Sequence, residues 1–485
     1  MLWFALAVNI FIVTSTVECF PNIVIILIDD SGYSDINANQ TRFIDSIARN
    51  GATFTDAYVT APQCSPSRAG LLTGRYQQRF GHESNSEFQV ALSNPKCRII
   101  PEYLPAQYLS AMIGKWNLGD IPNAPRAHGF NVSYLYRHFD EAFADKRPVL
   151  WNDTLQVRGR EYSTNLMFQR AEEFIENVTS MKSNPFFLYL APMSPHVPLV
   201  YPPAYEPFFE SLDPRLPKSR RKVLTMMQEI DDGVGRVLAT LKRTRSFEDT
   251  LLFFINDNGA PMFPRHEGQV NSEPNFPLRG FKGDTFEGGV RIPFHMQWPS
   301  VIVPNQIVSR PVISMDILST IVDILGVFSP RDPQSPDARP DLDGRSILPY
   351  LQLLGPFRDQ YSKRKLKQHS SGDSSDYTGD RLLFWRFGME CKPIKRAVRH
   401  GDWKWVQYGN ENYQLYNLTA DISESHNLAA SFAELAAHYA DAFARWNNTL
   451  PPIHSREKKT PSQCQQINHP HLHPHAPRKA SPAAT

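Results

Sequence analysis

Two pairs of oxygen-bearing side chains each follow an apolar run, and together they have the composition of a hard-cation site. Asp29 and Asp30 come directly after the apolar residues 22–28, and Asp257 and Asn258 come after residues 250–255. Carboxylate and amide oxygens are the ligands that Ca²⁺ and Mg²⁺ prefer. A single Asp-Asp pair is usually a helix cap or a solvated turn. Two oxygen-rich pairs at two strand ends instead predict a metal site, with ligand types that suit Ca²⁺ and also Mg²⁺.

A cysteine-containing segment at residues 64–75, CSPSRAGLLTGR, carries the most specific pattern in the chain. A cysteine followed by proline and arginine is, by itself, compatible with an ordinary turn and an unmodified buried thiol. The complete pattern resembles the signature of the type I sulfatases of the alkaline-phosphatase-like superfamily, in particular arylsulfatases and N-acetylgalactosamine sulfatases. The matching residues are Cys64, Pro66, Arg68, Leu72, Thr73, Gly74 and Arg75.

The resemblance implies a modified nucleophile. In this family a formylglycine-generating enzyme oxidises the cysteine, here Cys64, to formylglycine during secretion. The hydrated aldehyde offers one hydroxyl to attack sulfur and keeps a second with which to expel sulfate, so one difficult step becomes two easier ones. Arg68 would hold the formylglycine hydroxyl. The Ca²⁺ ligands that the resemblance implies are Asp29, Asp30, Cys64 (as formylglycine), Asp257 and Asn258.

Three further segments match the family in chain order and carry basic side chains. Gly114-Lys115-Trp116 resembles the second sulfatase signature, which makes Lys115 a sulfate-binding lysine. The segment 194–198 places His196 where the family has a histidine that contacts the ester and is proposed to assist the leaving group. The segment 281–283 makes Lys282 the matching active-site lysine. Basic side chains converging beside a divalent ion suit an anionic sulfate ester.

The second signature departs from the family at one position. It reads Gly-Lys-Trp-Asn-Leu-Gly, with Asn117 where the family has a histidine that bonds a formylglycine hydroxyl and is the favoured base for expelling sulfate. Asparagine forms hydrogen bonds but takes no proton near neutral pH. Two outcomes stay open: slow turnover through water or another group, or trapping of a sulfated intermediate. The segment 81–85, which contains His82 and Glu83, is expected to line the sugar site.

The elements that must position these residues alternate between strands and helices. Residues 22–28, 185–191 and 250–255 are apolar on successive positions, as in central parallel strands covered on both faces. Residues 220–244 carry apolar side chains at three- and four-residue spacing, which predicts a helix. We therefore expect an α/β fold, whose ligands lie at the carboxyl ends of the strands. The family resemblance specifies an alkaline-phosphatase-like, mixed but mostly parallel sheet with helices on both faces.

The chain divides into five predicted parts: a signal peptide (1–19), a catalytic domain (20–354), a polar loop or linker (355–380), a small α+β domain (381–455) and a disordered His/Pro-rich tail (456–485). The small domain carries strand-like pieces at 382–385 and 403–407 and a helix at 431–446. Its segments 399–404 and 415–418 resemble the second domain of sulfatases. The resemblance therefore covers residues 21–450, nearly the whole mature chain.

The first residues predict export. A short apolar run at 2–13 is followed by small and polar residues, so we place signal cleavage after Cys19. Cleavage leaves Cys64, Cys97, Cys391 and Cys464, of which the last three could pair or stay free. No later segment is long and apolar enough to span a membrane. We expect a secreted or lysosomal glycoprotein, with N-glycosylation predicted at the six sequons Asn39, Asn131, Asn152, Asn177, Asn417 and Asn447.

The charge balance argues against one class of function, and three interpretations of the family resemblance stay open. Lys and Arg total 51 and Asp and Glu total 49, a balance that argues against a dedicated nucleic-acid binder. The leading interpretation is a sulfuric ester hydrolase acting on a sulfated carbohydrate, with aryl sulfates as artificial substrates. The alternatives are a degenerate sulfatase that binds sulfated glycans without turnover, and a phosphoryl or phosphonate hydrolase on the same fold.

Overall fold

The computed structural model describes most of the chain from Phe20 to Ile453. The described residues are 20–36, 40–85, 92, 97–119, 124–136, 149–152, 155–158, 162–181, 184–262, 274–327, 342–370, 381–388 and 393–453. The expected signal peptide and tail lie outside them, as do Asn39, Cys391 and Cys464. Cys97 is buried and forms no disulfide with a described cysteine. Within the described segments, no helix combines the length and the apolarity that crossing a bilayer requires.

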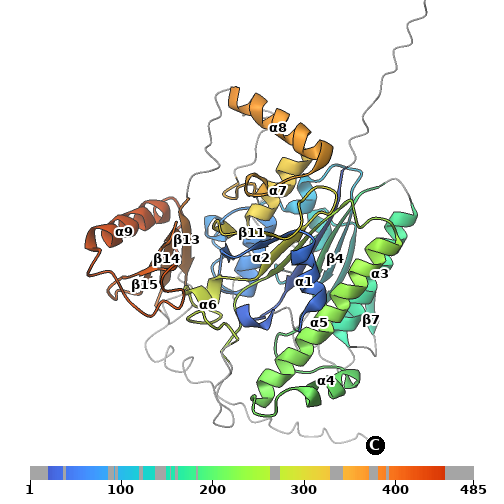
Figure 1. Ribbon diagram of the computed structural model, residues 1–485, viewed down its shortest axis with the longest axis horizontal. Coiled ribbons are helices and arrows are strands. Elements are labelled where there is room, and N and C mark those ends of the chain that lie inside the picture. Colours follow the sequence, from blue (N-terminus) through green and yellow to red (C-terminus); the bar gives the residue numbers. More distant parts are fainter. Residues whose placement is uncertain are drawn as a thin grey trace, which may run out of the picture.

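A ten-stranded mixed sheet forms the centre of the molecule (Figure 1), in the order β11-β2-β10-β9-β1-β8-β4-β5-β6-β7. The strands from β9 to β5 run parallel, whereas β10, β6 and β7 pair antiparallel. The strands are β1 (Asn22–Ile28), β2 (Ala52–Phe54), β4 (Leu109–Gly114), β5 (Val132–Tyr136), β6 (Val149–Asn152), β7 (Leu155–Arg158), β8 (Phe186–Ala191), β9 (Thr250–Asn256), β10 (Phe294–Gln297) and β11 (Gln306–Val308). The predicted strands at 22–28, 185–191 and 250–255 are confirmed as β1, β8 and β9.

Helices cover both faces of this sheet, as a run of consecutive apolar residues requires. Alternate residues of β1 enter two separate cores, so that Val24 and Ile26 join one and Ile23 and Ile25 the other. The first core lies under α1 (Arg42–Arg49), α3 (Ser163–Ser180) and α5 (Lys218–Arg243); α5 is the helix predicted from the spacing in 220–244. The second lies under α2 (Cys64–Thr73) and α7 (Asp316–Leu325).

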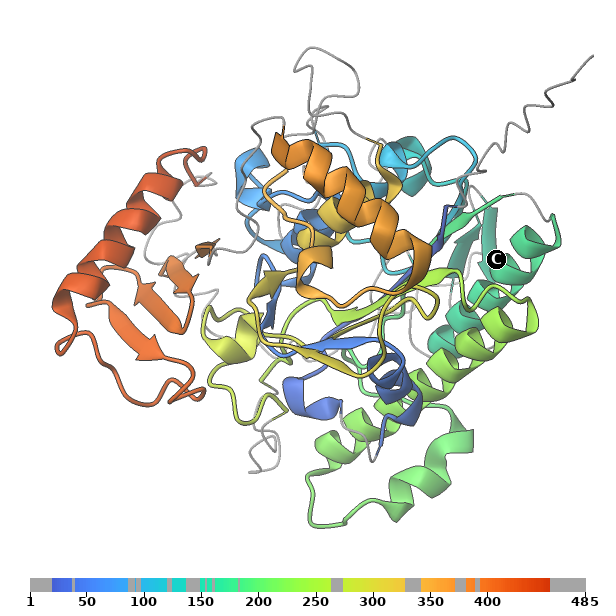
Figure 2. The ribbon, with the colours of Figure 1, turned by 45° about the horizontal axis from the view of Figure 1, so that its top comes forward.

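A smaller domain follows, with a four-stranded antiparallel sheet of β13 (Leu383–Phe387), β14 (Lys395–His400), β15 (Trp403–Tyr408) and β16 (Gln414–Asn417). The helix α9 (Ala433–Asn447) packs on it, and Figure 2 shows this unit beside the central sheet. The indole of Trp385 donates a hydrogen bond of 2.7 Å to the carbonyl of Val59 in the larger domain. The predicted strand pieces and helix are confirmed, and β14 and β16 complete the sheet.

The stretch predicted to be a polar loop begins instead with a helix, α8 (Gly355–Ser370). Its anchors are two aromatic residues one turn apart, Phe357 and Tyr361. Phe357 packs against Trp298 at 5.0 Å between ring centroids, and the Tyr361 hydroxyl donates to Asp323 at 3.1 Å. The polar composition concealed this pair, which fixes one face of α8 on the larger domain. Residues 371–380, the rest of the expected linker, lie outside the described residues.

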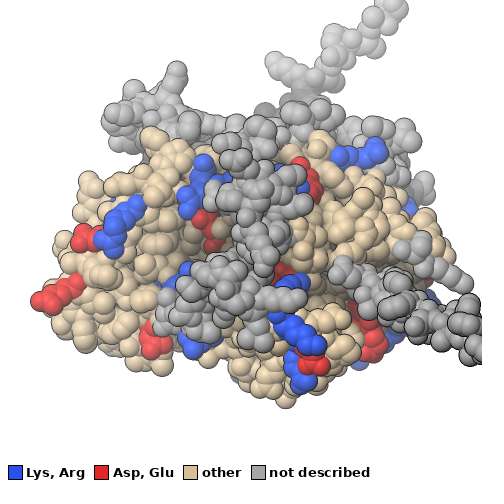
Figure 3. Space-filling view, turned by 90° about the horizontal axis from the view of Figure 1, so that it is seen from above, with Lys and Arg blue, Asp and Glu red and all other residues tan. Residues whose placement is uncertain are grey.

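Shorter elements complete the described part of the chain. They are β3 (Ala57–Tyr58), β12 (Val312–Ile313), α4 (Glu206–Ser211), α6 (Glu287–Val290), and the 3-10 helices η1 (Tyr33–Asp35), η2 (Gln77–Phe80), η4 (Ile100–Tyr103), η5 (Pro125–His128), η7 (Pro203–Tyr205) and η8 (Leu348–Tyr350). On the face shown in Figure 3, the described Lys and Arg side chains are interspersed with Asp and Glu. Of the predicted glycosylation sites, Asn131 and Asn177 are exposed and Asn417 and Asn447 half-buried, while Asn152 lies in β6.

Candidate active site

The carboxyl ends of β1 and β9 bring the two oxygen-rich pairs together. The two strands are parallel neighbours, with Ile28 opposite Asn256, so the residues that follow them meet at one edge of the sheet. The backbone amide of Asp30 donates to Oδ1 of Asp257 at 3.3 Å. The backbone of Asp30 has a φ of 66°, a left-handed conformation that Asp tolerates better than most residues.

The predicted metal ligands form one buried cluster. Ligand atoms of Asp29, Asp30, Cys64 and Asp257 all lie within 4.8 Å of one another. Asn258 joins them by donating from Nδ2 to Asp30 at 2.7 Å. Its Oδ1 is buried and has no hydrogen-bond partner among the described residues. A buried acceptor without a donor is costly, and an oxygen-binding cation beside the three carboxylates would satisfy it. The residues therefore fit a hard divalent cation.

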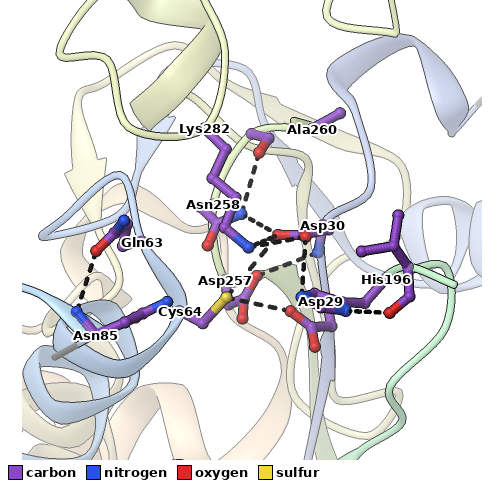
Figure 4. A network of polar contacts seen from close by, with 12 residues as sticks. Asp29, Asp30, Gln63, Cys64, Asn85, His196, Asp257, Asn258, Ala260 and Lys282 are labelled. Carbon is purple, nitrogen blue, oxygen red and sulfur yellow. Dashed lines mark hydrogen bonds and ion pairs between the residues drawn. The ribbon is translucent and has the colours of Figure 1, made fainter. Parts of the chain in front are cut away.

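Cys64 begins α2 and points into this cluster (Figure 4). Its thiol donates to Oδ1 of Asp29 at an Sγ–O distance of 3.4 Å. The backbone amide of Ser65 donates to Oδ1 of Asn85 at 2.9 Å, which ties the start of the helix to the following loop. Burial, reinforced by the charge of Asp257, raises the pKa of the Cys64 thiol to about 12. The thiol is therefore neutral at physiological pH and is a poor nucleophile as encoded.

Four cationic or ionisable groups surround the carboxylates. Lys115 Nζ donates to Asp29 at 2.6 Å, and the Arg68 guanidinium donates to Asp257 at 2.7 and 3.0 Å. On the other side, Lys282 Nζ donates to Asp30 at 2.8 Å, and Nε2 of His196 lies 3.5 Å from the same carboxylate.

Lys115 is held by the end of β4. Gly114 has a φ of 114°, and a Cβ there would lie 2.1 Å from the carbonyl oxygen of Ala191. Only glycine permits that approach, which lets the Lys115 amide donate to the same carbonyl at 2.8 Å. The Lys115 carbonyl in turn accepts from Arg68 at 2.7 Å. The two sequence signatures therefore support each other directly.

The electrostatic balance of the site suits an anionic ligand. Burial would raise the pKa of Asp29, but the charges of Lys115 and His196 outweigh it and hold that pKa well below its usual range. Positive and negative charges are equal in number among three carboxylates and three cations: Asp29, Asp30, Asp257, Arg68, Lys115 and Lys282. A bound divalent cation would make the cluster positive and attract an anionic ester.

The site opens on the side of His196 and Lys282. Each of these side chains is 15% exposed, whereas Asp29 and Arg68 are fully enclosed and Lys115 is 3% exposed. Nδ1 of His196 lies 2.7 Å from the carbonyl oxygen of Val197, which fixes the ring with Nε2 toward the cluster. A ligand that enters here meets His196 and Lys282 first and the buried groups behind them.

Asn117 contacts the start of α2 through Ser65, the neighbour of Cys64, and the sequence did not predict this contact. Its φ is 59°, and its carbonyl accepts a hydrogen bond of 2.6 Å from the Ser65 hydroxyl. The fully buried His82 places Nε2 2.8 Å from that hydroxyl oxygen. Oδ1 of Asn117 is buried and forms no hydrogen bond with a described residue.

The expectation that residues 81–85 line the sugar site stays a prediction. His82 and Glu83 are both buried, and Glu83 pairs with Arg386 of the smaller domain. The sequence does not reveal the contacts of His82, because His82 lies 17 residues from its partner Ser65. Ser65 in turn lies 52 residues from Asn117. Linear spacing carries no signal for such a chain of contacts.

Comparisons with known proteins agree with the geometry. A family model described as Sulfatase matches residues 21–327. The chain is 31% identical to human N-acetylgalactosamine-6-sulfatase over 374 residues, covering 70% of this chain and 67% of that protein. It is 29% identical to the arylsulfatase of Hemicentrotus pulcherrimus over 347 residues, covering 64% and 59%. The crystal structure of Ps i-CgsB in complex with k-i-k-neocarrahexaose aligns with a TM-score of 0.75 and 26% identity, covering 93% of this chain and 97% of that one.

Proposed function

The chain belongs to the sulfatase family and is thus a sulfuric ester hydrolase, and from this premise we propose that it removes sulfate from a sulfated carbohydrate with formylglycine at position 64 and bound Ca²⁺. The observation that carries the proposal is the position of the Cys64 side chain. It lies 3.4 Å from Asp29, in a buried cluster with Lys115, Arg68 and Lys282.

The high pKa of the Cys64 thiol makes the unmodified cysteine a poor nucleophile, which favours a modified nucleophile at this position. A hydrated aldehyde at position 64 attacks sulfur with one hydroxyl, and the bond between sulfur and the ester oxygen breaks. His196, which lies at the open side of the site, donates a proton to the departing sugar oxygen. The attacking hydroxyl gives its proton to water as the new sulfur–oxygen bond forms. In the second step the remaining hydroxyl gives its proton to water, the aldehyde carbonyl re-forms, and the bond between its carbon and the sulfate oxygen breaks, so that sulfate leaves. Addition of water to the aldehyde then restores the two hydroxyls.

The surrounding residues bind and orient the ester. Lys115 and Lys282 neutralise charge on the sulfuryl oxygens, and Arg68 holds the nucleophile. Asp29, Asp30, Asp257 and Asn258 would hold Ca²⁺ together with residue 64, and that ion would supply Lewis-acid polarisation of the ester. The ligand types also accept Mg²⁺.

Support for a carbohydrate substrate comes from the relatives. One is named for N-acetylgalactosamine-6-sulfatase activity, and a structural neighbour was solved with neocarrahexaose. A sulfated glycan is therefore the substrate class that we propose, and a formylglycine-generating enzyme is the partner required during passage to the cell exterior or the lysosome.

A second candidate function rests on Asn117. Because this side chain accepts no proton, the protein would bind sulfated glycans, or be sulfated once, without further turnover. The buried Oδ1 of Asn117, which has no partner among the described residues, favours a role in hydrogen bonding over one in proton transfer.

The deciding experiment is a time course of phenol release from an aryl sulfate, using secreted protein whose conversion at Cys64 has been verified by peptide mass. Steady release beyond one equivalent supports the hydrolase. A burst of one equivalent followed by a halt supports the trapped intermediate. No release by verified formylglycine protein would contradict both catalytic proposals. An aryl phosphate assayed in parallel tests the phosphoryl hydrolase alternative, and Cys64→Ala is the blank.

A further inference from the structure

A pocket of about 400 Å³ lies between α3, α5 and the loop that follows His196. The two helices line one side of the pocket, and the segment around η7 lines the other. It is lined by Tyr162, Asn165, Pro202, Ala204, Tyr205, Glu229, Asp232, Gly233 and Arg236. None of these residues belongs to the site around Cys64, so the pocket is a separate feature of the larger domain.

Glu229 distinguishes this pocket from a simple surface depression. The residue is only 4% exposed, yet its Oε1 is buried and receives no hydrogen bond from any residue that the structure describes. A buried carboxylate oxygen without a donor costs free energy unless something else satisfies it. Glu229 therefore places in the pocket wall a carboxylate with one oxygen that receives no donor from the described residues.

Most other polar groups of the wall have partners, although Nε of Arg236 is buried and forms no hydrogen bond with a described residue. Asp232 accepts from the Tyr205 hydroxyl at 3.0 Å and from Gln228 at 3.0 Å. Arg236 donates to Oδ1 of Asn165 at 2.7 Å, and its Nε lies 3.1 Å from Glu172 on α3. The charge of Arg236 therefore offsets only part of the negative charge of Glu229, and Asp232 adds a second negative charge one turn along α5.

Size and ligand chemistry narrow the class of occupant. Among the described residues, the side chains that could together hold a metal ion are those of the cluster around Cys64. Glu229 does not belong to that cluster, so we expect an occupant other than a metal ion. A volume of about 400 Å³ exceeds what a bare ion fills and admits a small organic molecule. The tyrosine, proline and alanine walls suit a carbon skeleton, and aromatic faces favour cations.

We propose that this pocket binds a small organic ammonium ion, with the charged nitrogen donating to Glu229 and the carbon skeleton lying against Tyr162, Tyr205 and Pro202. Such a ligand supplies both the missing donor and a positive charge beside two carboxylates. A neutral alcohol supplies only the donor, and an anion supplies neither.

The ionisation of Glu229 gives the binding a characteristic pH dependence. Burial, with a smaller contribution from Asp232 and opposition from Arg236, raises the pKa of Glu229 to about 8. The charged groups that face it are Asp232 and Arg236 on α5 and, beyond Arg236, Glu172 on α3; Tyr162 and Tyr205 complete the wall. An ammonium ion binds the ionised carboxylate, so Glu229 must lose its proton on binding. Affinity should therefore rise by roughly tenfold between pH 7 and pH 9, while an alkylammonium stays charged.

Calorimetric titration of the full-length protein with n-butylammonium tests the site, with n-butanol as the neutral isostere. We expect binding of n-butylammonium, no detectable binding of n-butanol, and an affinity at least tenfold weaker in Glu229→Gln. The matched control is Glu173→Gln, because Glu173 is a partly exposed carboxylate of α3 that pairs with Arg170. It should bind as the unmodified protein does.

Three results would overturn the proposal: no binding at millimolar n-butylammonium, equal affinity in both glutamine variants, or an affinity independent of pH. The pH series uses the unmodified protein, so it decides the question even if Glu229→Gln does not fold. No sulfate ester is present in any titration, so the outcome is independent of the proposed sulfatase chemistry.

Discussion

Nζ of Lys115 lies 2.6 Å from Oδ2 of Asp29, and both side chains are buried. The pair joins the end of β4 to the end of β1 across the intervening strand β8. It therefore fixes the position of a proposed sulfate-binding cation relative to a proposed metal ligand. Charge pairs of this kind are costly to break, because the remaining partner keeps its charge in a buried site.

Removal of the Lys115 charge should abolish most activity. We expect Lys115→Met to lower kcat/KM on an aryl sulfate by about 10²–10³-fold, as for loss of one preorganised electrostatic group. The variant should also unfold more easily, because Asp29 loses its closest counter-charge. Lys218→Met, at the exposed start of α5, is the control for loss of a lysine. Activity within a few-fold of the unmodified protein would rule out a role for Lys115 in binding the ester.

Removal of the bound cation should lower both activity and stability. Chelator-treated protein should lose turnover and melt at a lower temperature, because the carboxylates around Cys64 would lose a shared ligand. A cation present at 100 times its Kd stabilises a fold by about 2.7 kcal/mol. Calorimetry and aryl sulfate assays, with Ca²⁺ or Mg²⁺ added back separately, measure both effects. Asp257→Asn should show a smaller Ca²⁺-dependent shift in melting temperature, and an unchanged melting curve after chelation would contradict the metal site.

The parts of the fold predictable from sequence were those whose side chains report their surroundings locally. A run of consecutive apolar residues has only one common explanation in a sheet, so β1, β8 and β9 were recognised. The helix α8 was missed because its anchors, Phe357 and Tyr361, are two aromatic residues in a strongly polar segment. Their partners, Trp298 and Asp323, lie far away in sequence.

The same distinction applies to the site. The strand-end pairs and the Cys64 segment carry their chemistry in adjacent residues, and the structure brings those residues together. The hydrogen bonds from His82 through Ser65 to Asn117 depend on how two loops meet the start of α2, and no local pattern encodes that meeting. The departure at Asn117 was visible in the sequence, whereas the residues that hold it were not.

The Ser65 hydroxyl should position Asn117 without touching the ester. Ser65→Ala removes the donor to the Asn117 carbonyl and leaves the fully buried His82 without that partner. We expect kcat to fall by roughly tenfold, about the effect of losing one hydrogen bond, with KM and the pH profile unchanged. His82→Gln, which keeps a donor, should retain more activity than His82→Leu. Independent, additive effects of Ser65→Ala and His82→Leu would contradict a shared chain of contacts.

A buried triad between the domains should make stability depend on pH. Lys404 lies 2.7 Å from Glu287 and 3.1 Å from Glu424, and all three are fully buried. Burial raises the pKa of Glu424 to about 7, with Lys404 opposing and Glu287 reinforcing the shift. A raised carboxyl pKa means that the folded state holds an extra proton, so this stabilisation is present at low pH and is lost as the pH rises from 4.5 to 7.

Glu424→Gln should remove this pH dependence. The amide resembles the protonated carboxyl, so the variant and the unmodified protein should have similar free energies of unfolding near pH 4.5. At pH 8 the variant should be the more stable of the two, because it avoids ionising a buried group. Denaturant titrations at both pH values measure the difference. A variant that is equally destabilised at both would indicate that Glu424 stays ionised in the folded protein.

Asn117→His tests whether the departure from the family limits sulfate release. The backbone at position 117 has a φ of 59°, and histidine, like asparagine, is among the residues that tolerate this conformation. The carbonyl contact to Ser65 is made by the backbone and should survive the change. A base placed beside the nucleophile is worth about 10²–10⁴-fold in rate. If the unmodified protein stops after one equivalent of phenol, the variant should therefore turn over continuously, with a pH–rate profile that rises through the histidine pKa. Asn117→Gln, which adds length but no base, is the matched control and should still stop. Equal steady-state rates for all three proteins would mean that another group or water already expels sulfate.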